Sequence, residues 1–178
     1  MNTLLVRFFC IIVFVYSAHS VLFAQGTLPD AAILAPAAAI NEILGTHIAE
    51  GPSSLKGKYC SRKSPDGSEE TVIQYTDFHD SKTAQSMLQM NFEGNQKDIA
   101  QNKLAVGIYE TITLFPDAGA NANVMTGTGT NAAWKNNVRF QFVLGSYLVS
   151  FDTRGTPMAS VIEKLSAIYK MIKTNSGM

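Results

Sequence analysis

The C-terminal third of the chain carries the clearest alternation of hydrophobic and polar positions. Two short segments separated by Leu144-Gly145-Ser146 have an apolar residue at every second position, namely Val138, Phe140, Phe142, Tyr147, Val149 and Phe151. A period of two is typical of a β-strand that buries one face. Glycine readily adopts the positive φ that a two-residue loop requires. The pattern therefore predicts a β-hairpin over residues 138–151.

A helical pattern follows this hairpin. Thr156-Pro157 is typical of a helix start, with a hydroxyl at the N-cap and proline at the first helical position. Apolar residues then recur every three or four positions, at Met158, Val161, Ile162, Leu165, Ile168, Tyr169 and Ile172. This spacing predicts an amphipathic helix that packs its apolar face against the hairpin.

The preceding part of the chain contains weaker signals of both kinds. We predict helices at residues 36–44, with Pro36 at the first position and Gly45 as the stop, and from Asp80 or Ser81 to Gly94-Asn95. We predict strands at residues 58–63, 71–76 and 105–115, a turn at 64–67, and a short strand at 124–126. Two segments keep two interpretations, residues 27–39 as a lead-in to the first helix or an exposed linker, and residues 96–103 as a loop or a short helix.

Hairpins dominate this order of elements, and no regular β-α-β alternation occurs. Hairpins join antiparallel strands, whereas parallel sheets require helical crossovers. The predicted fold class is therefore α+β: an antiparallel sheet with helices packed on it, ending in a C-terminal β-hairpin followed by an amphipathic helix.

Residues 1–24 have the features of an export signal. Arg7 precedes an unbroken apolar run, and small residues follow that run. The alternative is a membrane anchor, which needs about 20 apolar residues, but Arg7 and His19 interrupt the apolar stretch. We therefore expect a signal peptide, a single domain over residues 25–178, no integral membrane segment after cleavage, and a periplasmic or secreted location.

Charge and cysteine content narrow the range of partners. The chain has 14 basic and 14 acidic residues, and removal of Arg7 with the signal leaves 13 − 14 = −1. Nucleic-acid binding needs a clustered basic face, so we expect no nucleic-acid partner. Cys60 is the only cysteine after cleavage, which excludes an intrachain disulfide. We expect no cofactor, because Gly127 and Gly129 lack the lysine that completes a phosphate-binding loop.

Several motifs together resemble a known group of proteins. They are Leu34-Ala35-Pro36 leading to Ile43-Leu44-Gly45, the strand with Cys60, the Asp66-Gly67 turn, the strand from Val72 to Tyr75, and the terminal hairpin with its helix. In this order they resemble small exported bacterial α+β domains, many of them lipoproteins, which are similar in shape to the PsbP-like fold. The resemblance implies a fold but no catalytic residues. The chain departs from the group because it has no lipid-anchor cysteine and no partner for Cys60.

His47, Asp77 and His79 are the candidate metal ligands. Imidazole and carboxylate groups both bind Zn²⁺, but the spacing matches no strong ligand motif. The alternative is that the acids here stabilise a helix N-terminus. Cys60 with His47 or His79 as base is a candidate thiol site, although a lone cysteine in a strand is usually a small buried hydrophobe.

Residues 118–137 are the candidate recognition segment. They are rich in Gly, Ala, Thr and Asn, and a connection of this length in a compact domain often has a function. We hypothesise that Asn131, Trp134, Lys135 and Asn137 line a binding surface. Trp134 is equally compatible with a place in the core.

These observations favour an exported, non-catalytic binding or accessory module. Its partner would be an envelope or extracellular protein or a small ligand, of a kind that the sequence does not identify. Two alternatives remain open. One is a metal-dependent or thiol hydrolase, and the other is a carrier of a small apolar ligand held between helix and sheet.

Overall fold

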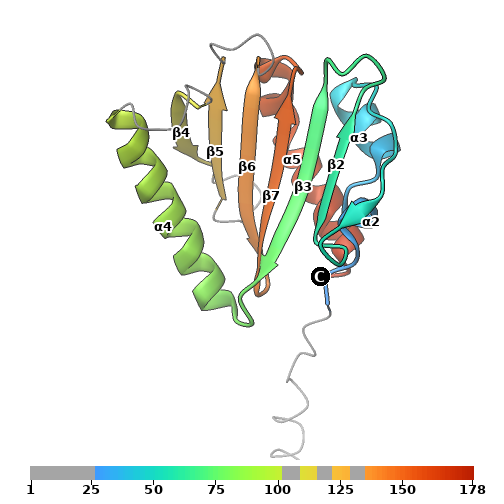
Figure 1. Cartoon of the computed structure of the whole chain (residues 1–178). Helices are drawn as coiled ribbons and strands as arrows, with labels where there is room; N and C mark the ends of the chain where they lie inside the picture. The colour runs from blue at the N-terminus through green and yellow to red at the C-terminus, as the bar shows by residue number, and fades with distance from the viewer. Residues whose placement is uncertain (1–26, 102–108, 116–121, 129–134) are drawn as a thin grey trace, which may run out of the picture.

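The computed structural model describes residues 27–101, 109–115, 122–128 and 135–178 (Figure 1). The predicted signal peptide lies outside these residues. The described strands form one seven-stranded antiparallel sheet in the order β1-β2-β3-β7-β6-β5-β4. Their bounds are β1 Ser53–Ser54, β2 Tyr59–Lys63, β3 Glu70–Asp77, β4 Thr111–Leu114, β5 Ala122–Gly127, β6 Asn137–Leu144 and β7 Tyr147–Arg154. The predicted α+β fold is confirmed.

Helices cover both faces of this sheet. The helices are α2 Ala31–Leu34, α3 Ala37–Leu44, α4 Ser81–Ala100 and α5 Met158–Ser176. Figure 1 shows α5 behind the sheet with α2 and α3, whereas α4 starts at the lower end of β3 and rises towards β4. Within the described part of the chain, no helix combines the length and the apolar character that crossing a membrane requires.

The main core lies between α5 and the sheet. The hairpin prediction is confirmed, since β6 and β7 pair through a two-residue turn at Gly145-Ser146. Phe140, Phe142 and Phe151 are at most 1% exposed and face the buried stripe of α5. The ring of Phe142 also meets Tyr169 of α5 edge to face, with centroids 5.1 Å apart. Burial of these large apolar groups is the dominant stabilising contribution to such a fold.

The predicted helix α5 allows a direct test. Leu165 is fully buried in the centre of the stripe, whereas Lys164 beside it is exposed. We expect Leu165→Ala to lower the free energy of unfolding by about 2–5 kcal/mol, because it leaves a cavity in the core. Lys164→Ala should change it by less than about 0.5 kcal/mol. Urea denaturation of both variants measures the difference, and equal midpoints would show that the assigned helix face is wrong.

The N-terminal segment is packed rather than an exposed linker. Ala31, Leu34 and Ala35 are completely buried, and α2 contacts both α5 and β2. The predicted helix after Pro36 is confirmed as α3, with Gly45 in the left-handed conformation at its end. Pro36 is the N-cap, one position before the predicted place, and Pro157 has the same role for α5.

Three predicted boundaries are wrong. The strand predicted at 105–115 is observed only as β4, Thr111–Leu114, and residues 102–108 lie outside the described part of the chain. The helix from Ser81 does not end at Gly94-Asn95 but continues to Ala100. Gly94 lowers helix stability by only about 1 kcal/mol, and the helix gains contacts with four strands along its length. The predicted short strand at 124–126 is six residues long, and as β5 it pairs on both sides, with β4 and β6. The strand extends beyond the predicted one to Ala122 at its start and to Gly127 at its end.

Candidate functional site

The α4 side of the sheet is unusually polar for a buried surface. The strand register places Asn123 of β5 opposite Gln141 of β6, and Gln141 opposite Ser150 of β7. Side chains that lie directly opposite each other have Cβ atoms about 5 Å apart. All three residues are at most 9% exposed. The alternating pattern had indicated that Gln141 and Ser150 face solvent, and this is wrong because α4 covers them.

Helix α4 lies over this polar row with little apolar contact of its own. Of its 20 residues, only Ala84 and Leu88 are buried. One turn further on, the inward stripe changes to the half-buried residues Asn91, Phe92 and Asn95. The helix starts at a firm cap, because the Asp80 carboxylate accepts a hydrogen bond from the Thr83 amide at 2.8 Å. The result is a helix held at its N-terminus that does not seal the sheet beneath its second half.

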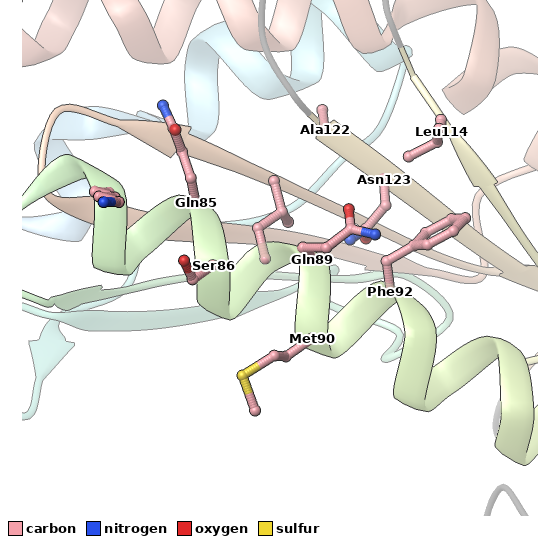
Figure 2. Close-up of a pocket in the computed structure, with 10 residues that line it drawn as sticks. Gln85, Ser86, Gln89, Met90, Phe92, Leu114, Ala122 and Asn123 are labelled. Carbon is pink, nitrogen blue, oxygen red and sulfur yellow. The ribbon is translucent and has the colours of Figure 1, made fainter.

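A groove of about 550 Å³ lies between α4 and the β4–β5 side of the sheet. Its polar lining includes Gln85, Ser86, Gln89 and Asn123, and its apolar lining includes Leu88, Phe92 and Leu114. Figure 2 shows Gln89 and Phe92 on the side of α4 that faces Asn123, whereas Met90 points away. Small-molecule sites have volumes of about 300–1,000 Å³, so the groove is large enough to hold a ligand.

Asn123 is the most informative residue of this groove. It is completely buried, yet neither its Oδ1 nor its Nδ2 has a hydrogen-bond partner among the described residues. The Gln141 Oε1 and Ser150 Oγ atoms beside it are also without partners. An unsatisfied buried polar group costs about 1–3 kcal/mol. Of these three residues, Asn123 is the one that lines the groove.

The next row of the same sheet face carries charges that are paired. Arg139 donates from Nε to Asp152 Oδ1 at 2.6 Å and from Nη2 to Oδ2 at 3.3 Å. Its guanidinium also lies 5.3 Å from the centre of the Tyr109 ring. Burial and the Asp152 carboxylate raise the pKa of Tyr109 to about 12. Arg154 and Glu70 form a second cross-strand pair at 2.9 Å. The first pair joins β6 to β7 and the second joins β7 to β3, so these charges support the strand register rather than form an open site.

The candidate metal ligands are not brought together. The amide of His47 donates to Glu69 just before β3, whereas Asp77 and His79 follow at the other end of that strand. Eight residues of strand separate the two ends by roughly 25 Å. His79 lies 3.4 Å from Asp77, and its amide holds the pKa of Asp77 below the usual range. No group of three possible ligands occurs among the described residues.

Cys60 lacks the surroundings of a reactive thiol. It is buried in β2, and its Sγ donates to the Gly51 carbonyl at 3.5 Å rather than to an imidazole. Burial raises the pKa of the Cys60 thiol, whereas nucleophilic cysteines have a lowered pKa. The environment is that of a small buried hydrophobic residue.

The hypothesised recognition surface falls only partly within the structure. Asn131 and Trp134 lie outside the described residues. Lys135 is exposed, and its carbonyl accepts a hydrogen bond from the Gly155 amide at 2.8 Å. Asn137 is completely buried at the start of β6. Of the two described members, only Lys135 is thus available to a partner.

The sequence contains two features that point to this site, one in β5 and one in α4. The segment before β6 contributes a strand, Ala122–Gly127, whose one amide side chain points to the α4 side. The inward stripe of α4 also becomes polar after Leu88. A buried amide and a polar helix stripe facing each other indicate a wet interface, but only the strand order brings them together.

Comparison with known proteins adds no functional assignment. No protein-family model matches the chain, and no curated protein is significantly similar to it. The groove must therefore be interpreted from its own chemistry.

Proposed function

We propose that this protein is a non-catalytic binding module, exported from the cytoplasm, whose recognition site is the groove between α4 and the β4–β5 side of the sheet. The ligand is a small, uncharged, hydrogen-bonding molecule. The observation that carries the proposal is Asn123, a fully buried amide that lines the groove with both polar atoms unpartnered. A bound molecule that both donates and accepts would satisfy this amide.

The lining favours binding over catalysis. Amide and hydroxyl side chains form hydrogen bonds without changing protonation state near neutral pH. General acid–base catalysis needs a titratable group within reach of the substrate. Lys82 is the one such group among the residues that line the groove, and it is exposed at the first turn of α4.

The polar floor also favours this ligand over a small apolar one. A carrier of an apolar ligand between helix and sheet would need an apolar cavity, but between α5 and the sheet Phe142, Leu165 and Ile168 are completely buried members of one core cluster. The groove lies on the opposite face. An apolar ligand there would leave Asn123 unsatisfied, and specific sites reject such ligands for this reason.

Nuclear magnetic resonance of the protein without its signal segment tests the proposal. Glucose, N-methylacetamide and uracil represent three kinds of uncharged polar fragment. We expect at least one of them to shift the Asn123 side-chain NH₂ signals in a saturable manner. Asn123→Leu should abolish the remaining groove shifts, whereas Gln96→Leu, an exposed change on α4 outside the groove, should not.

Two further outcomes decide how the binding result is interpreted. Asn123→Leu should be at least as stable as the wild type, because it removes an unsatisfied buried amide. Loss of binding would then not reflect unfolding. Absence of any saturable shift with all three fragments would overturn the proposed site.

A further inference from the structure

We propose that the ligand of this groove is a short neutral saccharide, an inference that rests on the binding function proposed above. Apart from Lys82, the hydrogen-bonding side chains that line the groove are uncharged, and they are Gln85, Ser86, Gln89 and Asn123. Each amide provides a donor and an acceptor, and each hydroxyl does the same. Sugar hydroxyls have this dual character, so they match a lining made of amide and hydroxyl side chains.

An apolar surface lies beside these polar groups. Phe92 of α4 is half-buried, and Leu114 of β4 is 63% exposed although both line the groove. Figure 2 shows the two side chains at the same end of the groove, next to Asn123. A pyranose ring has an apolar C–H face and a rim of hydroxyls. An aromatic ring and an aliphatic side chain next to amides match both surfaces of such a ring.

The backbone around Asn123 argues against a peptide. An extended peptide normally binds by adding a strand to an open sheet edge, where main-chain hydrogen bonds provide the affinity. Strand β5 is paired with β4 on one side and with β6 on the other. Recognition at Asn123 therefore depends on side chains alone, which suits a ligand with many hydroxyls better than one that offers a regular backbone.

The charge of the lining argues against an ionic ligand. A phosphate or carboxylate is usually bound by Arg, by several basic groups or by free backbone amides. Lys82 is the one charged residue in the lining, and it is exposed at the start of α4. Glu93, which is not part of the lining, accepts a hydrogen bond from Gln89 Nε2 at 2.7 Å, so a carboxylate lies one turn along α4 from Gln89. A neutral ligand is neither strongly attracted nor repelled by the charges of Lys82 and Glu93.

Binding of defined sugars to the protein without residues 1–24 tests the inference. Maltose, cellobiose and diacetylchitobiose are titrated by calorimetry and by the NMR signals of Asn123, with N-methylacetamide and uracil as non-sugar probes. We expect saturable binding of at least one disaccharide that is tighter than that of glucose. Phe92→Ala should weaken it about tenfold, as expected for loss of a stacking contact, whereas Lys97→Ala, an exposed change on α4 outside the groove, should not.

The possible outcomes separate the two proposals. If Phe92→Ala fails to fold, the exposed Gln89→Ala provides the same comparison, and it too should weaken sugar binding. Binding of N-methylacetamide or uracil without any sugar would overturn the saccharide assignment but leave the binding site in place. Failure of all probes would overturn both. A sugar that binds equally well to Asn123→Leu would show that the site lies elsewhere and would also overturn the assignment.

Discussion

Replacement of Arg62 with alanine is expected to lower the free energy of unfolding by about 3–5 kcal/mol. The Arg62 side chain in β2 is completely buried. Its Nη1 donates to the Ala35 carbonyl at 2.7 Å and its Nη2 donates to the Ala32 carbonyl at 3.1 Å. These are the carbonyls that the end of a helix leaves without partners. Arg62→Ala would leave both carbonyls unsatisfied and open a cavity between α2 and the sheet.

Glu50 provides the matched control for this prediction. Its Oε2 lies 3.4 Å from Arg62 Nε, but its side chain is 63% exposed, so its charge is well solvated. The other oxygen accepts from the Ala37 amide at 2.9 Å, at the first turn of α3. Glu50→Gln keeps that acceptor and should cost less than about 1 kcal/mol. Equal urea midpoints for Arg62→Ala and Glu50→Gln would show that the hydrogen bonds from Arg62 to the Ala32 and Ala35 carbonyls contribute little to stability.

The hairpin and α5 could be predicted from the sequence because the information for both is local. Phe140 and Phe142 alternate within a few residues, and Leu165 and Ile168 lie on one turn of the same helix. Burial on the α5 side then follows from periodicity alone. The resemblance to small exported α+β domains led to the same fold class. Neither source of information depended on knowing how the strands are ordered.

The α4 face could not be predicted in the same way. Ser150 and Asp152 occupy the polar positions of an alternating strand, which is the usual pattern of a solvated face. They are buried because α4, some 60 to 70 residues earlier, packs across β6 and β7, and because Arg139 on the neighbouring strand pairs with Asp152. Such partners are set by strand register, and a single sequence does not reveal register between distant segments.

Strand β5 shows the same limit at the candidate site itself. Its sequence from Ala122 to Gly127 lies in a stretch rich in Gly, Asn and Thr, which local rules assign to loops. It is nevertheless an inner strand, next to the edge strand β4, where pairing on both sides outweighs weak strand propensity. The predicted strand covers only residues 124–126, so the prediction does not place Asn123 in the sheet.

Gly155→Ala is expected to lower the free energy of unfolding by about 4–6 kcal/mol, the upper range of the combined costs of backbone strain and overpacking. Gly155 connects β7 to α5 with φ +83°, a conformation that alanine adopts only with strain. A Cβ atom at this position would lie 1.9 Å from the carbonyl oxygen of Ser68 and 2.9 Å from its carbonyl carbon. Both atoms belong to the backbone of the β2–β3 turn, so no rotation of a side chain can relieve the clash.

Gly67 in the same turn separates the two costs. Its φ of +72° is similar, but a Cβ atom there would have no neighbour within 4 Å. Gly67→Ala should therefore cost only the strain of a left-handed residue, about 1–2 kcal/mol. The difference between the two variants in urea denaturation measures how firmly the β2–β3 turn is held against the β7–α5 connection. If the two losses are equal, the turn moves freely away from Gly155, and the close approach of Ser68 makes no contribution to the stability of the fold.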